Sequence, residues 1–268
     1  MFFGVLLIFL YAPIAVLVIF SFNDSLLVSL PLSGFTTKWY RLLLDNEELT
    51  SSLQVSLVIA GISSVVAVGL GVLASYALVR RRVPGKGAAS ALLLSPLVIP
   101  YVVFGIALLI LFQSLDDFLI PRFGFYFGFG VHTIVIGHVV VSIPYTILTI
   151  MPRLEKLGVA VEEAAHDLGG SSVSTFRRVT LPLLTPSVIS AYLIAFTLSF
   201  DEYAIASFVA GDVSTYPLFL YGQVRIRIGL PQMIAISVIV LVLSLVFVIG
   251  VEAWRRHAEQ RLGMQPVV

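Results

Sequence analysis

The chain has 268 residues, of which 59% are hydrophobic and only 12% are charged. Soluble domains carry about 25% charged residues, so this composition excludes an ordinary soluble enzyme and a disordered chain. The 16 basic and 15 acidic residues nearly cancel, which excludes a basic surface for nucleic acid. Cysteine is absent, which excludes disulfides, a thiolate nucleophile and a cysteine metal site.

Six apolar stretches are long enough to form transmembrane helices, because about 20 residues span the hydrocarbon core. They are expected near Phe2–Phe22, Ser52–Val79, Gly87–Phe112, Val131–Met151, Ser187–Phe208 and Met233–Ala253. The first stretch lacks a basic leader and a small-residue cleavage site, so we interpret it as a retained helix. Prolines inside the spans predict kinks; they are Pro96, Pro100 and Pro144. The sequence predicts an all-α integral membrane protein whose single domain covers residues 1–268.

The basic residues predict the orientation in the membrane. Eleven of the 16 fall in the connection after the second span, the connection after the fourth span and the C-terminal tail. They are Arg80, Arg81, Arg82, Lys86, Arg153, Lys156, Arg177, Arg178, Arg255, Arg256 and Arg261. The others, which include Arg225 and Arg227, fall in the remaining connections. The positive-inside rule places the richer side, and with it both termini, in the cytoplasm.

The polar connection after the fourth span, residues 152–186, is expected to form a helical hairpin. Gly169 and Gly170 favour a break between two short helices, and Ser171 or Ser172 could cap the second helix. Pro182 and Pro186 are expected to close the segment before the fifth span. Length and polarity alone are compatible with a solvated loop or with a docking element for a cytoplasmic partner.

The residue spacing in this connection favours the docking element. Glu163-Ala164-Ala165 is followed after three residues by Gly169, and after nine more by Val179-Thr180-Leu181-Pro182. This pattern resembles the EAA signature of permeases in binding-protein-dependent ABC importers, with Val179 in place of the usual Ile. The resemblance implies a type I ABC-importer permease fold, in which the hairpin is a coupling helix that docks on an ATP-binding subunit. By this resemblance the ATPase-coupling residues are Glu163, Ala164, Ala165, Gly169, Leu181 and Pro182.

The resemblance extends over nearly the whole chain to spermidine/putrescine permeases of the PotC type. It includes Ser21-Phe22-Asn23, the segment from Gly34 to Tyr40, and the run from Phe196 to Glu202. It implies ATP-driven import of a polyamine across the bacterial inner membrane. It also implies three partners: a homologous second permease that forms a heterodimer, a dimer of ATP-binding subunits, and an extracytoplasmic solute-binding protein.

Other functions stay open at this point. Relatives of the same architecture import opines, iron, thiamine or phosphonates, and a homodimeric importer has the same signature. A secondary transporter driven by an ion gradient is a different class, but the sequence shows no obvious inverted repeat.

Two consecutive acids, Asp201 and Glu202, are expected inside the fifth span. A charge in hydrocarbon costs about 2.5–3.5 kcal/mol, so each should face a cavity or a partner. Asp201, Glu202 and Tyr203 are therefore the candidate residues of the substrate pathway, where carboxylates and aromatic rings suit a cation. Because neighbouring helix residues point in different directions, we expect Asp201 to face the pathway and Glu202 to pair with a neighbour. A packing role for both acids is an equal alternative.

The remaining polar residues suggest no catalysis. No G-x-x-x-x-G-K-[ST] phosphate-binding loop occurs, so a separate subunit is expected to hydrolyse ATP, and we expect no catalytic residue, metal or cofactor on this chain. His138 in the fourth span is expected to be a packing residue. Asp116 and Asp117 are expected in a solvated connection between the third and fourth spans.

Overall fold

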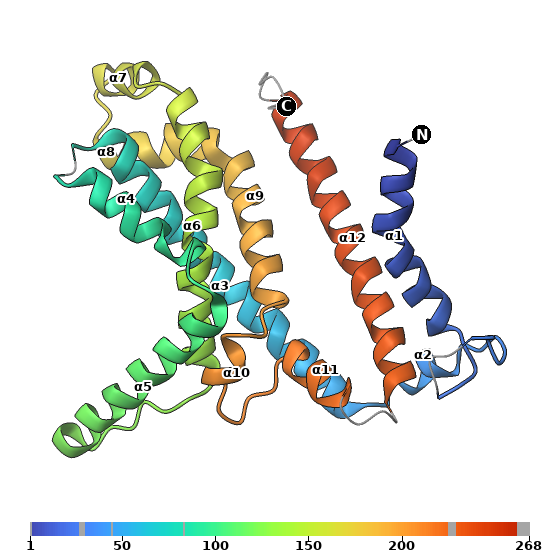
Figure 1. The fold of residues 1–268 in the computed structure, drawn as a ribbon. Coiled ribbons are helices and arrows are strands. Elements are labelled where there is room, and N and C mark those ends of the chain that lie inside the picture. Colours follow the sequence, from blue (N-terminus) through green and yellow to red (C-terminus); the bar gives the residue numbers. More distant parts are fainter. Residues whose placement is uncertain (1, 27–29, 44, 83, 225–228, 262–268) are drawn as a thin grey trace. The chain divides into compact units, whose positions relative to one another are not determined.

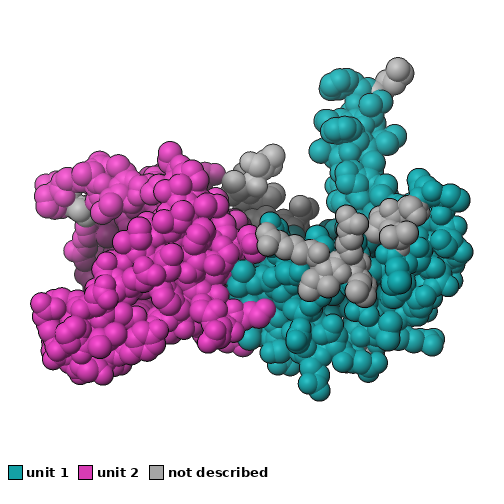
Figure 2. All heavy atoms as spheres, turned by 60° about the horizontal axis from the view of Figure 1, so that its bottom comes forward, with its two compact units in different colours: residues 1–55, 215–251 teal, residues 56–214, 252–268 magenta. Residues whose placement is uncertain are grey.

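The computed structural model describes residues 2–26, 30–43, 45–82, 84–224 and 229–261. Arg225 and Arg227, for which the sequence predicted a side of the membrane, lie outside the described residues. The chain divides into two compact units, shown in different colours in Figure 2. Unit 1 comprises residues 1–55 and 215–251, and unit 2 comprises residues 56–214 and 252–268.

Six described helices are long and apolar enough to cross a membrane, as the sequence predicted. They are α1 (Phe2–Ser21), α3 (Glu47–Arg80), α5 (Tyr101–Phe123), α6 (Val131–Lys156), α9 (Leu181–Phe200) and α12 (Leu230–Arg261) (Figure 1). Short elements lie between them: α2 (Lys38–Leu42), α4 (Lys86–Leu94), the 3-10 helix η1 (Ser95–Leu97), α7 (Ala160–Asp167), α8 (Ser172–Thr175), the π-helix η2 (Phe176–Thr180), α10 (Ala206–Val209) and α11 (Tyr216–Val224).

The third span differs from the prediction of one helix over Gly87–Phe112. The chain there forms α4 and η1, and the membrane-length helix α5 begins only at Tyr101. Pro96 lies in the first turn of η1, and Pro100 is the N-cap of α5. Proline lacks an N–H and disfavours helical geometry in the residue before it, so these two prolines end and start helices instead of kinking one. Pro144 does lie inside a continuous helix, α6.

The fifth span, predicted over Ser187–Phe208, is wrong at both ends. The elements α8, η2 and α9 follow one another without a gap from Ser172 to Phe200. Pro182 lies in the first turn of α9 and Pro186 lies inside it, so neither proline closes the segment as we expected. The helix ends at Phe200, and Asp201 is its C-cap.

The core of unit 2 is formed by α3, α6 and α9. Buried side chains from these three helices pack together; they are Val68, Val72, Ile150, Leu154, Leu184 and Ala191. A close approach of α3 to α6 accompanies this packing, because a Cβ added at Gly71 would lie 1.9 Å from Thr146 Oγ1 and 2.7 Å from Thr146 Cβ. Small residues permit such close helix contacts in lipid.

In unit 1, residues 21–23 and 34–40 fold on one another beside the end of α1. The Trp39 indole N–H donates to the Asn23 carbonyl oxygen (2.8 Å), and the Tyr40 hydroxyl donates to Ser21 Oγ (2.6 Å). The rings of Phe22 and Phe35 stack with centroids 5.0 Å apart. These residues therefore have a structural role in fixing the chain that leaves α1.

Gly71→Ala should destabilise the protein by about 1–3 kcal/mol, because the added methyl overpacks the α3–α6 contact. Thermal unfolding of the detergent-solubilised complex measures this effect. Gly69→Ala is the matched control, since its Cβ would meet nothing within 4 Å on the same helix. Equal melting temperatures for the two variants would contradict the packing argument.

Candidate functional site

The polar break after α9 brings together the sequence-predicted residues Asp201, Glu202 and Tyr203. Asp201 is exposed, Glu202 is buried and Tyr203 is half-buried. The sequence predicted both acids inside the fifth membrane helix, and this prediction is wrong. They lie in the turn that separates α9 from α10. In this turn the Asp201 side chain is open to the surroundings, whereas the Glu202 side chain is buried in the protein.

The Glu202 carboxylate has three hydrogen-bond partners, all within unit 2. Its Oε1 accepts from the Ile205 amide (2.8 Å), and its Oε2 accepts from the Ala206 amide (3.0 Å). His138 Nε2 lies 3.2 Å from Glu202 Oε2, and His138 Nδ1 lies 2.7 Å from Ser199 Oγ. The side chains of the His138–Glu202 pair are only 1% and 2% exposed. Glu202 thus pairs with a neighbour, as expected, and His138 has a specific partner beyond packing.

Small residues let the chain after Glu202 lie close to α5 and α6. A Cβ at Gly137 would approach Ile205 Cγ2 to 2.7 Å, and a Cβ at Gly105 would approach the Phe208 ring to the same distance. At the far end of α10, the Thr133 hydroxyl donates to the Val209 carbonyl oxygen (2.6 Å). The segment 202–209 is therefore held at both ends, and this fixes the position of the exposed Asp201.

An aromatic stripe along α9 leads to Asp201. The rings of Tyr192 and Phe196 lie 6.0 Å apart, and those of Phe196 and Phe200 lie 6.3 Å apart. The four-residue spacing puts them on one face of the helix. Phe200 is buried, whereas Tyr192 and Phe196 are half-buried and can offer part of their faces to an organic cation. The exposed Asp201 carboxylate adds a full negative charge at the end of the helix.

The segment between α6 and α9 forms the predicted helical hairpin, here residues 157–180. Gly169 ends α7 with φ of +86°, a left-handed conformation that favours glycine. Ser171 is the N-cap of α8, where its Oγ accepts from the Ser174 amide (3.3 Å). Both local predictions are confirmed.

Most of the residues that the signature singled out are exposed, on the hairpin and at the start of α9. Glu163, Ala164, Gly169 and Pro182 are exposed, while Ala165 and Leu181 are half-buried. Apolar side chains accompany them on the hairpin surface: Val161 is 42% exposed, Leu168 is 92% exposed and Val173 is 69% exposed. These side chains leave apolar area on the hairpin that a partner surface could cover.

The sequence analysis did not predict the roles of two residues in and beside the hairpin. Glu162, next to the signature glutamate, is buried and pairs with Arg80 at the end of α3. Helical spacing within α7 offers a signal, because Glu162 and Ala165 share the inward face while Glu163 lies on another. The identity of the partner was not accessible, since Arg80 lies 82 residues away.

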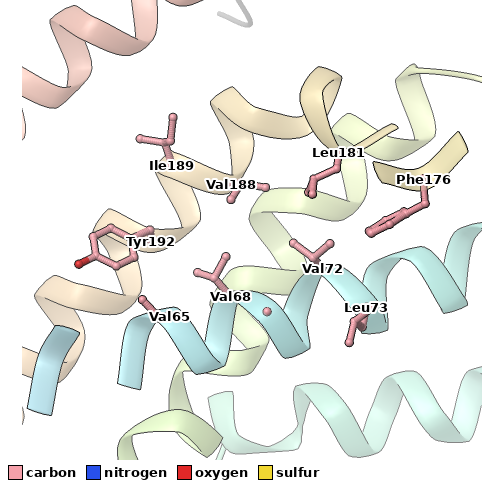
Figure 3. A pocket seen from close by; sticks show the side chains of 10 residues that line it. Val65, Val68, Val72, Leu73, Phe176, Leu181, Val188, Ile189 and Tyr192 are labelled. Carbon is pink, nitrogen blue, oxygen red and sulfur yellow. The ribbon is translucent and has the colours of Figure 1, made fainter. Parts of the chain in front are cut away.

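A cavity of about 580 Å³ lies between α3 and α9 near the hairpin (Figure 3). Its lining is aliphatic and aromatic, with Val68, Val72, Leu181 and Val188 pointing toward one another and Phe176 and Tyr192 at either side. No carboxylate lines it. The cavity therefore suits apolar groups and offers a cation no charged partner.

Asp116 and Asp117 do not lie in a solvated connection, as we expected, because α5 continues to Phe123. The buried Asp116 carboxylate accepts from the Phe127 amide (2.7 Å) and the Gly128 amide (3.1 Å). It fixes the turn between α5 and α6, which gives it a structural role. No cluster of three potential metal ligands occurs among the described residues.

Comparison with known proteins places these features in a family. The sequence profile described as "Binding-protein-dependent transport system inner membrane component" matches residues 67–263, well over half of the chain. The chain belongs to this family. It is thus the membrane permease subunit of an ABC importer, a non-catalytic component whose ATPase is a separate subunit, and it is a multi-pass protein of the inner membrane.

Curated relatives support the resemblance to polyamine permeases. The permease is 38% identical over 259 residues to the putrescine transport system permease protein PotI of Escherichia coli K12, covering 95% of this chain and 89% of the relative. It is 37% identical over 243 residues to the spermidine/putrescine transport system permease protein PotC of the same strain, covering 90% and 88%.

Solved structures support the fold. A bacterial ABC transporter for the acidic polysaccharide alginate matches with a TM-score of 0.71 at 14% identity, covering 94% of this permease and 91% of that chain. The MetNI methionine ABC transporter, in an inward-facing conformation, matches with a TM-score of 0.58 at 16% identity, covering 84% and 99%.

Glu202→Ala should lower the thermal stability of the complex far more than Asp201→Ala. The first change leaves His138 and two buried amides without an acceptor, and each such loss costs about 1–3 kcal/mol. The second removes an exposed side chain. Melting temperatures of both variants test this difference, and similar values would show that the Glu202 contacts do not hold the turn.

Proposed function

We propose that this permease imports a polyamine such as spermidine or putrescine. The observation that carries the proposal is the similarity to PotI and PotC along nearly the whole chain, because PotI is a permease of a putrescine transport system and PotC of a spermidine/putrescine transport system. The exposed Asp201 carboxylate and the half-buried rings of Tyr192 and Phe196 on the same helix support it, since an ammonium group gains from both a carboxylate and aromatic faces.

In this proposal the solute pathway runs past Asp201 and Tyr203. Asp201 offers an exposed carboxylate to one ammonium group of the polyamine, and the half-buried Tyr203 ring lies two residues further on. Glu202 belongs to the same turn but is bonded to His138 and the α10 backbone, so it positions Asp201 instead of meeting the solute.

The hairpin, residues 157–180, is proposed to be the coupling element that binds an ATP-binding subunit. It carries the EAA signature, and its exposed surface combines Glu163 with the open apolar side chains of Val161 and Leu168. Closure of the ATPase dimer would move the hairpin and, through it, the membrane helices. The hairpin and both termini would then be cytoplasmic, in agreement with the positive-inside rule.

The other components of the importer are proposed by the same reasoning. A homologous second permease would form a heterodimer with this chain, a dimer of ATP-binding subunits would hydrolyse ATP, and an extracytoplasmic binding protein would deliver the solute. The permease itself would bind no cofactor.

Uptake of labelled spermidine and putrescine tests the solute. Vesicles carrying the permease with its co-encoded partners should accumulate the label only with internal ATP. Asp201→Asn should lower this uptake by about tenfold, which corresponds to the loss of about 1.4 kcal/mol of interaction. An intact complex with active ATPase but no polyamine uptake would refute the polyamine and direct the search to an opine, iron, thiamine or a phosphonate. Uptake without any ATPase subunit would instead indicate a secondary transporter.

Substitutions in the hairpin test the coupling role. Gly169→Pro imposes a φ near −65° where the chain needs a positive φ, and Glu163→Lys reverses an exposed charge. Both should abolish ATP-driven uptake while the membrane spans of the permease still insert. Glu155→Lys is the control, because Glu155 is equally exposed but precedes the hairpin. Normal uptake and normal ATPase stimulation in both hairpin variants would refute the coupling assignment.

A further inference from the structure

Arg80, the last residue of α3, joins three segments of unit 2. Its Nε lies 3.1 Å from Glu162 Oε1 on α7. Its Nη2 donates to the carbonyl oxygen of Leu154 (2.9 Å), in the last turn of α6, and to that of Gly158 (2.7 Å), two residues beyond the helix. Carbonyls in the last turn of a helix lack intrahelical partners, and the guanidinium satisfies them with a planar set of donors.

Glu162 extends this network to the start of α9. Its Oε1 also accepts from the Thr180 hydroxyl (3.0 Å), which lies in the π-helical turn η2. The ring of Phe176 from the same turn packs edge-on against Tyr76 of α3, with centroids 5.0 Å apart. One carboxylate thus connects α7, α3 and the turn that begins the fifth membrane helix, and π-helical turns are frequent at functional sites.

The Arg80–Glu162 pair is buried, with side-chain exposures of 7% and 10%. A buried ion pair adds little net stability, because desolvation of the charges offsets their attraction. Breaking it by moving one partner is costly, since each charge would then remain buried alone. The pair therefore resists displacement of α7 relative to α3 and α6 more than it stabilises the fold.

We propose that the Arg80–Glu162 pair is the joint that fixes the hairpin to α3, α6 and α9, and that the importer needs this joint to convert ATP hydrolysis into transport. The inference rests on the proposed function, in which the hairpin binds the ATPase. Arg80 and Glu162 are positioning residues: they act through the hairpin. The signature glutamate Glu163 is exposed to a partner, while its neighbour Glu162 holds the hairpin from within.

The ratio of solute imported to ATP hydrolysed tests the joint. Arg80→Met and Glu162→Leu should each lower this ratio about fivefold or more, the low end of typical coupling between sites. The double variant should be no worse than the more severe single one, because both remove the same interaction and the double leaves no unpaired charge. Arg81→Met and Glu155→Leu are matched controls, since both residues are exposed in the same regions of the chain. A purely structural role predicts that uptake and ATPase activity fall together at a constant ratio, and this result would overturn the proposal.

A second measurement does not depend on the solute. The chain has no cysteine, so Leu148→Cys on α6 and Asp167→Cys on α7, both exposed, can carry a pair of spin labels in the assembled complex. The distance distribution between the labels should be narrow with the joint intact and broad in the Arg80→Met, Glu162→Leu background. A narrow distribution in both would refute the joint. If the unmodified complex imports no polyamine, the proposed solute fails while this measurement still decides on the joint.

Discussion

The hydrocarbon core of a membrane offers no hydrogen bonds, so a polar group buried in such a protein must find its partners within the chain. In the described part of unit 2, the buried carboxylates of Asp116 and Glu202 meet this constraint near the ends of membrane-length helices, and a third, Glu162, is paired in the hairpin between α6 and α9. Each lies where the chain changes direction. Glu202 binds the amides that begin α10, Asp116 binds the amides that precede α6, and Glu162 binds Arg80 beside the hairpin. The turns are fixed because the acids cannot be left unpaired.

Two pairs of consecutive acids divide their roles in the same way. In Glu162-Glu163 and in Asp201-Glu202, one side chain is buried and bonded while the other is exposed. The buried acid fixes the backbone, and the exposed acid is thereby presented at a defined place. The position of the exposed carboxylate is thus fixed by the hydrogen bonds of the acid next to it in the sequence, and no additional helix or loop is needed. It also explains why substitution of either neighbour should have different consequences.

The sequence predicted what depends on local chemistry. Six spans follow from apolar length, and the break at Gly169 and the cap at Ser171 follow from backbone conformation and hydroxyl chemistry. The predicted ends of the membrane helices were wrong where these ends depend on contacts with residues far away in the sequence. Nothing in the local sequence shows that Glu202 meets His138, and this contact accompanies the end of α9 at Phe200. Glu162 was overlooked for the same reason, because its burial depends on Arg80.

The length of α9 has a mechanical consequence. Its 20 residues, at 1.5 Å each, make a rod of about 30 Å. The rod begins directly after Thr180, whose hydroxyl donates to Glu162, and it ends beside its C-cap Asp201. A rod of this length that tilts by about 5° about one end carries its other end through about 2–3 Å. A small rotation of α9 at the hairpin end would therefore displace Asp201 by a distance comparable to the size of a side chain, with little change in the packing at the hairpin end.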